Sequence, residues 1–340
     1  MQEMILFNRI ILVIFRFWKL TLYFITQFCG ISELIMVLRY DSNNAPVEVY
    51  LTPERFMKIS IIGSGVVGQA TGRGLAHYGN DVVFNDVDKN KLSYLSNKGY
   101  KITKSVFDAV FHSDIVFVCV PTPTTNGEID LSFIKSITVD LAKALKKAQK
   151  YTVLTFKSTI LPQTTRTIIV PKLEKVSGLK AGKDFGVCMN PEFLTELNPL
   201  EDFLNPSRIV IGEFDEESGD ILEQLYSSFK KPIIRTDLDT AEMIKYVSNL
   251  FLASKISIFN EFYMVCNILG IDAQLVSEAA SLDSRIGKYG TRGGKPFGGM
   301  CFPKDLGAFL AFAKSKGLPS KILDAVAQVN KDIVSFNSEG

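Results

Sequence analysis

Residues Phe297–Asp305 combine a thiol with the flexible backbone that a covalent catalyst needs. The segment reads Phe-Gly-Gly-Met-Cys-Phe-Pro-Lys-Asp, with two glycines before Cys301 and a proline after it. This pattern predicts a loop that exposes the thiol, whereas Cys119, Cys188 and Cys266 lie in apolar stretches typical of buried cysteines. A reactive thiol suits an oxidation that carries an alcohol past the aldehyde to an acid, because a thiohemiacetal is itself an oxidisable alcohol.

Other polar side chains are spaced so that they would converge. Three pairs lie four residues apart, namely Glu192 and Glu196, Lys245 and Asn249, and Cys301 and Asp305. We expect each pair to share one face of a helix. The segment Lys157-Ser-Thr159 closes a predicted strand, which would place the Thr159 hydroxyl at the edge of a sheet. The alternative for the two glutamates and for the Lys/Asn pair is a solvated surface without a catalytic role.

A glycine-rich segment, Gly63-Ser-Gly65-Val-Val-Gly68, follows a predicted strand and opens a predicted helix. Gly63 permits a tight turn, Gly65 lets a pyrophosphate approach backbone N–H groups, and Gly68 lets the helix pack on the strand. Asp86 ends the next strand, 18 residues after Gly68, and is placed to bind both ribose hydroxyls. Its charge disfavours the 2′-phosphate of NADP, so the pattern predicts an NAD site. The alternative is that these glycines only form turns.

The elements that must position these residues alternate between strand and helix from Met57 onward. We predict strands over Lys58–Ile62, Asp81–Asn85, Ile115–Val120, Thr152–Phe156, Phe185–Met189 and Ile209–Ile211. Helices are predicted from Gly63 to about His77 and over Phe133–Ala148. Apolar strands that alternate with helices are typical of a parallel doubly wound sheet. The segment Val120-Pro-Thr-Pro would lie at the carboxyl edge of that sheet, where ligands bind, although its prolines also suffice to end the strand.

After Ile233 the pattern becomes helical. We predict helices over Thr240–Leu269, Asp272–Ala280 and Leu306–Lys316, with a glycine-rich loop over Gly287–Gly299. The predicted fold is therefore α/β, a doubly wound Rossmann-like parallel sheet followed by a helical central domain with one long connecting helix. The expected domains are NAD-binding over residues 57–236 and helical over residues 237–334, with a tail over residues 335–340.

The composition excludes several classes of partner. The 340 residues carry 38 Lys and Arg against 36 Asp and Glu, so the formal charge of +2 gives no reason to expect nucleic acid. The five cysteines show no Cys-x-x-Cys spacing, and the chain has only two histidines, so we expect no metal site. Reduced thiols in the cytoplasm are the expectation.

Residues 1–56 stand apart from this pattern. Met4–Leu38 is rich in Ile, Leu and Phe but is interrupted by Arg9, Arg16 and Lys19, so it predicts neither a membrane span nor a secretory signal. A basic amphipathic helix on a membrane surface is one interpretation. The favoured one is upstream translation without a conserved role, because a nucleotide-binding domain begins naturally at Met57.

Several segments together resemble the UDP-glucose 6-dehydrogenase family, within the wider UDP-glucose/GDP-mannose dehydrogenase group. The matching segments follow one another in the family's order: Gly63–Gly68, Val120-Pro-Thr-Pro, Lys157-Ser-Thr, Asn190-Pro-Glu-Phe-Leu, Ala241-Glu-Met-Ile-Lys-Tyr, Lys255–Glu261, Arg285-Ile-Gly and Phe297–Asp305. The Glu-Met-Ile-Lys-Tyr helix favours the UDP-glucose branch over the GDP-mannose and N-acetylmannosamine branches.

The resemblance implies a four-electron oxidation of UDP-glucose to UDP-glucuronate with two NAD, through a thiohemiacetal and a thioester on Cys301. It implies that Lys245 and Asn249 stabilise an oxyanion, that Asp305 holds water, and that Thr159 and Glu196 help to transfer protons. We expect the pKa of Cys301 to be lowered by Lys245. Dimerisation through the helix 240–269 is also implied.

The resemblance assigns two further sets of contacts. The cofactor-binding set is Gly63, Gly65, Val66, Val67, Gly68, Asp86, Lys91, Pro121, Thr122, Thr159, Glu196 and Lys304. The substrate-binding set is Glu192, Phe193, Leu194, Lys245, Asn249, Tyr289, Arg292, Phe297, Gly298 and Cys301.

Two departures from the family pattern bear on function. The loop Tyr289–Phe297 has Pro296 where a glycine is common, so its sugar contacts do not carry over. The family also ends in a second Rossmann-like unit that holds the uridine diphosphate, and the sequence ends at Gly340. Without that binding energy we expect turnover to be weakened or lost. The alternatives are an NAD-binding dimer without turnover, a dehydrogenase of another nucleotide sugar, and a one-step β-hydroxyacid dehydrogenase, which gives Cys301 no role.

Overall fold

The computed structural model describes residues 34–40, 46–53, 56–125 and 127–339. It divides into two compact units, Met1–Phe56 and Met57–Gly340. In the first unit, β1 (Leu34–Tyr40) and β2 (Pro46–Pro53) form an antiparallel pair that the sequence pattern did not predict. The surface helix considered around Arg9 and Arg16 lies outside the described residues. In the described part of the chain, no helix has the length and apolar character needed to cross a membrane.

The second unit is built on an eight-stranded sheet with the order β12-β11-β10-β9-β6-β3-β4-β5. Its strands are β3 (Lys58–Ile62), β4 (Asp81–Asn85), β5 (Lys101–Thr103), β6 (Ile115–Val118), β9 (Val153–Phe156), β10 (Gly186–Met189), β11 (Ile209–Glu213) and β12 (Ile233–Asp237). Neighbouring strands are parallel except β10 and β11, which are antiparallel. The predicted doubly wound sheet is confirmed, but β5 and β12 were not predicted and β6 ends two residues early.

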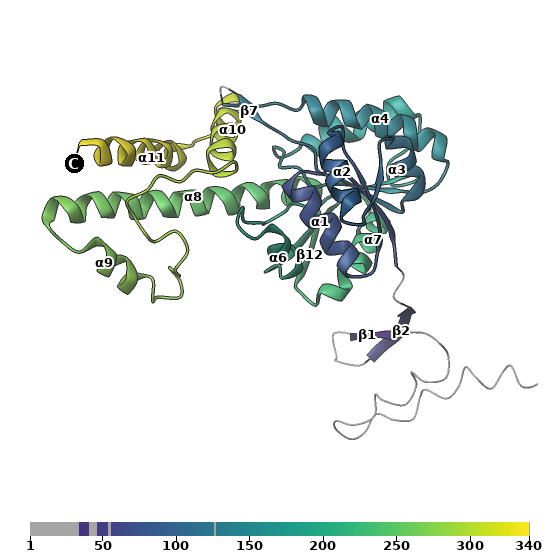
Figure 1. Cartoon of the computed structure of the whole chain (residues 1–340), viewed down its shortest axis with the longest axis horizontal. Coiled ribbons are helices and arrows are strands. Elements are labelled where there is room, and N and C mark those ends of the chain that lie inside the picture. The colour runs from purple at the N-terminus through teal and green to yellow at the C-terminus, as the bar shows by residue number, and fades with distance from the viewer. Residues whose placement is uncertain (1–33, 41–45, 54–55, 126, 340) are drawn as a thin grey trace, which may run out of the picture. The chain divides into compact units, whose positions relative to one another are not determined.

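Helices cover both faces of the sheet, as Figure 1 shows. One face packs against α1 (Val66–His77), α2 (Lys89–Asn97), α6 (Pro199–Leu204) and α7 (Glu216–Tyr226). The other packs against α3 (Val106–His112), α4 (Ser132–Ala148), α5 (Val170–Ser177) and the start of α8 (Leu238–Leu269). Strand β6 supplies both cores, because Ile115 and Phe117 point to the first face and Val116 and Val118 to the second. The inner strands of the sheet are thus buried on both faces, which explains their apolar sequences, whereas the edge strands β5 and β12 are partly exposed.

A small two-stranded hairpin and two short helices complete the connections. The hairpin pairs β7 (Thr124–Thr125) with β8 (Glu128–Ile129). The π-helix η2 (Thr165–Ile169) leads into α5, and the 3-10 helix η3 (Ser227–Phe229) follows α7. These short elements belong to the connections between the strands of the sheet.

The 32-residue helix α8 connects the sheet to the helical part. Asp237 caps it by accepting hydrogen bonds from the N–H groups of Asp239 and Thr240, and it ends at Gly270 with φ +68°. Figure 1 shows α11 (Lys321–Glu339) along one side of α8 and α9 (Ala273–Ala280) on the other. A third core joins α8 to α10 (Phe302–Ser315) and α11; its buried members are Tyr246, Leu250, Ala253, Phe297, Leu306 and Val326.

Helix α10 begins four residues earlier than predicted. Pro303 occupies its first turn, where a missing N–H costs nothing, so the helix starts directly after Cys301. The predicted long helix and glycine-rich loop are confirmed. The consequence for the site is that Cys301 stands at the N-terminal end of a helix and not inside a loop.

Candidate active site

The glycines of the first βα turn form a cradle at the carboxyl edge of the sheet. A Cβ on Gly68 would lie 1.9 Å from the carbonyl oxygen of Gly63, so only glycine allows α1 to approach β3 this closely. Gly63 has φ +92°, and a Cβ there would lie 2.6 Å from the Cys119 oxygen. At Gly65 a Cβ would meet nothing within 4 Å, so the space in front of the α1 N-terminus is open. This open space and the helix N-terminus fit a pyrophosphate.

Asp86 lies where a ribose would follow that pyrophosphate. Its two carboxylate oxygens accept hydrogen bonds from the N–H groups of Ser64 (2.6 Å) and Asp88 (2.8 Å). Lys91 lies 3.5 Å from the same carboxylate. Each oxygen keeps a free lone pair for one ribose hydroxyl, so the residues present fit the diol of NAD. Val66 is exposed and Val67 half-buried in the first turn of α1 beside this site.

The Val120-Pro-Thr-Pro segment contacts the next loop along the sheet edge. The hydroxyl of Thr122 donates a 2.8 Å hydrogen bond to the carbonyl oxygen of Thr159. Pro121 is exposed and Thr159 is half-buried. The structure therefore brings two of the predicted cofactor-binding loops together, at the end of β6 and the end of β9.

An ion pair joins the end of β10 to helix α8. The ammonium of Lys245 lies 2.7 Å from a carboxylate oxygen of Glu192, and these side chains are only 3% and 8% exposed. Helix α8 passes this edge because Ala241 packs on Gly212 of β11, and Lys245 follows one turn later. Although burial opposes ionisation of Glu192, the charge and hydrogen bond of Lys245 hold its pKa below the usual value.

The prediction that Glu192 and Glu196 share a helical face is wrong. Residues 190–195 form no helix, because Pro191 disfavours helical backbone before it and the Glu192 carboxylate accepts the Leu194 N–H at 2.6 Å. Glu196 instead accepts a 2.7 Å hydrogen bond from the N–H of Met300. The exposed Glu196 thus ties the 190–197 loop to the turn directly before Cys301.

A second polar cluster lies one helical turn along α8. The amide of Asn249 donates a 2.6 Å hydrogen bond to the carboxylate of Asp305, which is 1% exposed. Lys304 lies 2.5 Å from the other oxygen of the same carboxylate. The N–H of Asp305 donates to the Cys301 carbonyl oxygen at 2.9 Å, as expected for a pair four residues apart at the start of α10. The cluster fixes the carboxylate beside the thiol-bearing residue.

The pKa of Cys301 is raised, which corrects the expectation that Lys245 lowers it. Burial raises it most, the charge of Glu192 adds to the rise, and the charges of Lys245 and Lys304 only partly oppose it. The physical reason is that Glu192 pairs with Lys245 and compensates most of its charge at the thiol. At neutral pH the resting thiol is therefore protonated.

The remaining predicted contacts divide between core and surface. Phe297 is 6% exposed, packs in the helical core and donates its N–H to Asn330 at 2.7 Å. Gly298, Tyr289 and Arg292 are exposed residues of the glycine-rich loop. No hydrogen bond or ion pair among the described residues joins Tyr289 or Arg292 to Lys245 or Asp305, so their sugar contacts stay a prediction.

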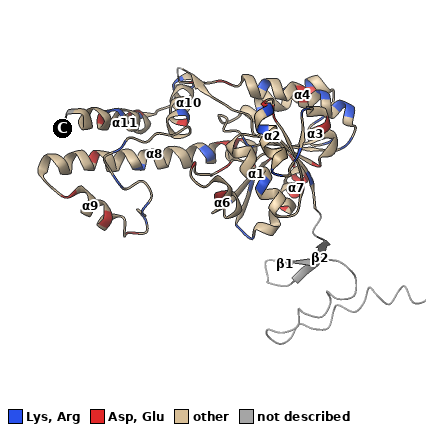
Figure 2. Cartoon of the chain, viewed as in Figure 1, with Lys and Arg blue, Asp and Glu red and all other residues tan. Residues whose placement is uncertain are grey.

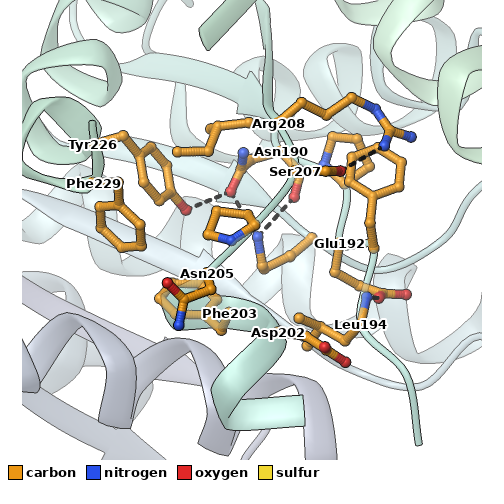
Figure 3. Close-up of a pocket in the computed structure, with 15 residues that line it drawn as sticks. Asn190, Glu192, Leu194, Asp202, Phe203, Asn205, Ser207, Arg208, Tyr226 and Phe229 are labelled. Carbon is orange, nitrogen blue, oxygen red and sulfur yellow. Dashed lines mark hydrogen bonds between the residues drawn. The ribbon is translucent and has the colours of Figure 1, made fainter. Parts of the chain in front are cut away.

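A cavity of about 250 Å³ adjoins the ion pair, and Figure 3 shows the side chains around it. Glu192, Phe193 and Leu194 line it together, and their substrate contacts stay a prediction. The guanidinium of Arg208 stacks 3.8 Å from the centre of the Phe193 ring. Arg208 was not predicted; it comes from the start of β11, whose reversed direction brings it to this edge.

The cavity is also lined by a cluster of buried polar side chains that the sequence reasoning missed. Lys157 donates to the side-chain oxygen of Asn190 at 2.7 Å, and the Tyr226 hydroxyl donates to the same oxygen at 2.7 Å. Burial lowers the pKa of Lys157 to about 8. The segment Lys157-Ser-Thr159 was identified from the sequence. A lysine at the end of a strand is usually exposed, however, so the sequence did not predict that Lys157 is buried.

The fold and site define an NAD-binding oxidoreductase with a helical second domain that supplies a thiol, an ammonium and carboxylates. Residues 57–105 and 95–230 match the NAD binding domain of the UDP-glucose/GDP-mannose dehydrogenase family, and residues 239–332 match its central domain. The chain belongs to this family. Its cofactor is NAD, and its class is that of the nucleotide-sugar dehydrogenases.

Individual relatives agree with this assignment. UDP-glucose 6-dehydrogenase AglM of Haloferax volcanii is 35% identical over 298 residues, which cover 81% of this chain and 69% of the relative. GDP-mannose 6-dehydrogenase of Pseudomonas savastanoi is 36% identical, with 81% and 68% covered. A UDP-glucose dehydrogenase structure from Pyrobaculum islandicum superposes with a TM-score of 0.77 at 34% identity, covering 83% of this chain and 70% of that one.

The open space at Gly65 leads to a prediction for cofactor binding. Gly65→Ala should weaken NAD binding about tenfold or more, or about 1.4 kcal/mol, because the new methyl group would stand where the pyrophosphate approaches. Titration calorimetry with NAD measures this, and the melting temperature should stay unchanged. The matched control is Gly307→Ala in α10, which should bind NAD normally. Equal NAD affinity in both variants would contradict the assignment of the cradle.

The raised pKa of Cys301 leads to a second prediction. Iodoacetamide should label Cys301 with a midpoint above that of a free cysteine, about pH 8.5, because burial and Glu192 disfavour the thiolate. Glu192→Gln should move this midpoint to lower pH. Mass spectrometry of the labelled peptides gives both curves, with Cys119 and Cys188 as internal controls whose pKa values of about 12 keep them unlabelled. A midpoint below 8 in the unaltered protein would contradict the electrostatic balance described above.

Proposed function

We propose that this protein oxidises UDP-glucose to UDP-glucuronate in two NAD-dependent steps, with Cys301 as the covalent nucleophile. The observation that carries the proposal is the cluster of Cys301, Lys245, Asn249 and Asp305, which Lys245 joins to Glu192 at the carboxyl edge of the sheet. A dehydrogenase that performs one oxidation needs no thiol, whereas a second oxidation at the same carbon has a direct use for one. The relatives named as UDP-glucose dehydrogenases support this substrate.

Bound NAD would accept the hydride in each oxidation. The protein's own side chains would supply the proton transfers, the nucleophile and the stabilising charges. In the first oxidation the C6 hydroxyl loses a hydride and a proton, and Thr159 and Glu196 assist the proton's departure. The thiol of Cys301 then adds to the aldehyde, so that a C–S bond forms and the carbonyl oxygen becomes a hydroxyl. Loss of the second hydride and of that hydroxyl proton leaves a thioester.

Lys245 and Asn249 would stabilise the oxygen that becomes negative in these steps. The ammonium is fixed by Glu192 at 2.7 Å and almost fully buried, so it needs no reorganisation when charge develops. Asp305, held by Asn249 and Lys304, is placed to orient the water that cleaves the C–S bond and releases the carboxylate. The same proposal locates the protein in the cytoplasm, where NAD and reduced thiols occur together.

The decisive experiment counts NADH released per sugar. The full chain should release two NADH per UDP-glucose, whereas Cys301→Ser should stop after at most one, because it can bind the aldehyde but cannot form the thioester. Absorbance at the NADH band against limiting UDP-glucose gives the stoichiometry. GDP-mannose and UDP-N-acetylmannosamine serve as competing substrates.

Each alternative has its own outcome in that experiment. Two NADH from GDP-mannose but none from UDP-glucose would move the substrate to the other branch. One NADH per sugar, unaffected by Cys301→Ser, would remove the thiol from the mechanism. No NADH from any sugar, with NAD binding intact, would leave an NAD-binding protein without turnover.

We also infer that a second copy of the chain packs against α8. A stripe of exposed apolar side chains runs along this helix at spacings of three, four and seven residues: Met243, Val247, Phe251, Ile258, Phe262, Val265 and Leu269. Figure 2 shows how few charges the helix carries along its length. An exposed apolar stripe of this length on a surface helix is typical of a protein–protein interface. A symmetric partner would present the same stripe.

The dimer is tested by a charge placed in the stripe. Phe262→Glu should convert the dimer to a monomer, because two buried carboxylates would face each other across a symmetric interface. Light scattering after size exclusion measures the mass, and Phe111→Glu, at an exposed phenylalanine of α3, is the matched control. A monomeric unaltered protein would contradict the inference outright.

A further inference from the structure

Glu242 is a fully buried carboxylate that the chemistry above does not use. It lies in the second turn of α8, three residues before Lys245, and its exposed fraction is 0%. One of its oxygens accepts two hydrogen bonds from Thr165, from the backbone N–H at 2.8 Å and from the hydroxyl at 2.6 Å. The other oxygen has no hydrogen-bond partner among the described residues. A buried carboxylate held on one side only calls for an explanation.

The partner of Glu242 belongs to the loop that carries Thr159. This loop follows β9 and enters η2 at Thr165, the first residue of that π-helix. Two residues earlier, Gln163 has φ +74°, a left-handed conformation that costs a non-glycine residue of order 1 kcal/mol and persists only where its surroundings enforce it. The two bonds to Glu242 supply that enforcement at the end of the loop. They therefore fix the course of the chain between Thr159 and η2.

The junction between the start of α8 and η2 also includes a contact at the protein surface. The guanidinium of Arg166 lies 3.1 Å from Asp239, which precedes Glu242 by three residues on α8. Arg166 is exposed and Asp239 only half-buried, so this solvent-screened pair contributes little to the junction. The buried contact between Thr165 and Glu242 is therefore the part of this junction that sets the position of η2 relative to α8.

We propose that Glu242 is a positioning residue, whose carboxyl group holds the Thr159 loop at a fixed place relative to the Lys245 and Asn249 face of α8. The inference rests on the proposed function, because it is the two-step oxidation that needs both elements around one reacting carbon. Thr159 comes from the sheet, and Lys245 and Asn249 come from the helix. Glu242 belongs to α8, and its side chain accepts hydrogen bonds from Thr165 at the end of the Thr159 loop.

The interaction of Glu242 with Thr165 depends on pH, because the pKa of Glu242 is set by its burial and by the charged groups around it. Burial raises the pKa of Glu242 to about 7, the bonds from Thr165 act against the rise, and the charge of Asp239 adds to it. Arg166 from η2 is paired with Asp239, and Lys245 is paired with Glu192. Tyr246, on the buried side, feels the charges of both Glu242 and Asp305 of α10. Because the pKa is raised, the folded junction favours the neutral acid over the carboxylate, so the hold of Glu242 on Thr165 weakens as Glu242 ionises.

Glu242→Gln tests the proposal, because glutamine keeps the shape and an acceptor oxygen but cannot ionise. At pH 6, where Glu242 is largely protonated, the variant should match the unaltered protein in kcat and in the KM for NAD. At pH 8, where Glu242 of the unaltered protein is ionised, the variant should show a kcat higher by about 3-fold or more with the KM for NAD nearly unchanged, since displacing a catalytic loop costs rate and not cofactor binding. Thr165→Val, which removes one of the two donors, should lower kcat at both pH values, again with the KM for NAD nearly unchanged.

A second readout does not depend on turnover. Amide hydrogen exchange across residues 161–169 should be slower in Glu242→Gln than in the unaltered protein at pH 8, by about 10-fold, and similar at pH 6, because ionisation of the buried carboxylate favours opening of the junction. The stability readout has a defined sign. Because the folded pKa of about 7 exceeds the ordinary 4.5, the folded chain holds more protons between these values, so the unaltered protein loses stability relative to Glu242→Gln as the pH rises from about 4.5 to about 7.

Arg166→Gln is the matched control, because it breaks the surface contact of the same junction. It should leave kcat and the exchange of residues 161–169 unchanged. Equal kcat and equal exchange in Glu242→Gln and the unaltered protein at pH 8 would overturn the proposal, and so would an Arg166→Gln effect as large as that of Glu242→Gln. If no sugar is oxidised, the proposed function fails, while the exchange and stability measurements still decide whether Glu242 holds the loop.

Discussion

The buried ion pair between Lys245 and Glu192 is the interaction on which the rest of the site depends. Two charges that are 3% and 8% exposed would each cost several kcal/mol to bury alone, and they persist because they lie 2.7 Å apart. Removing either partner would leave an unpaired buried charge, at a cost of about 3–5 kcal/mol. The pair forms only when α8 crosses the carboxyl edge of the sheet at the end of β10. It therefore links the correct docking of the helix to the presence of a charged, dry site.

That pairing also explains the state of the thiol. An isolated ammonium near a cysteine would favour the thiolate, but here Glu192 compensates Lys245 and burial raises the pKa of Cys301. A protonated thiol is protected against oxidation while the site is idle. The ammonium, in turn, is available to an oxygen that acquires negative charge during the reaction. Because Asp305 keeps its own partners, Asn249 and Lys304, the two carboxylates are held apart in separate hydrogen-bonded clusters.

Most of the fold follows from the sequence because its elements are strongly patterned. The limits of β3 and β4 match the prediction, since continuous apolar runs between turn residues define buried strands. Strand β12 was missed because its exposed and half-buried residues give no such run. The start of α10 was placed late because Pro303 was taken as part of a loop, although proline is well tolerated in a first helical turn.

The site was predictable as a set of residues but not as a set of contacts. Spacing correctly identified Lys245 with Asn249, because both lie on one long helix whose periodicity is plain. The same spacing failed for Glu192 and Glu196, since Pro191 and the bond from Leu194 keep that loop extended. Contacts between distant segments carry no local signal. Glu242 with Thr165, Arg208 with Phe193, and Lys157 with Asn190 are all pairs of this kind.

Helix α8 unites these features because one rigid element carries residues that serve different purposes. Its first turns seat on the sheet, where a Cβ on Gly212 would lie 2.5 Å from the Ala241 side chain, so the helix cannot rise without moving Glu242, Lys245 and Asn249 together. Through the core that it shares with α10, any such shift would also move Asp305 and Cys301. The position of the thiol relative to the cofactor cradle is therefore set by the seat of α8 on β11.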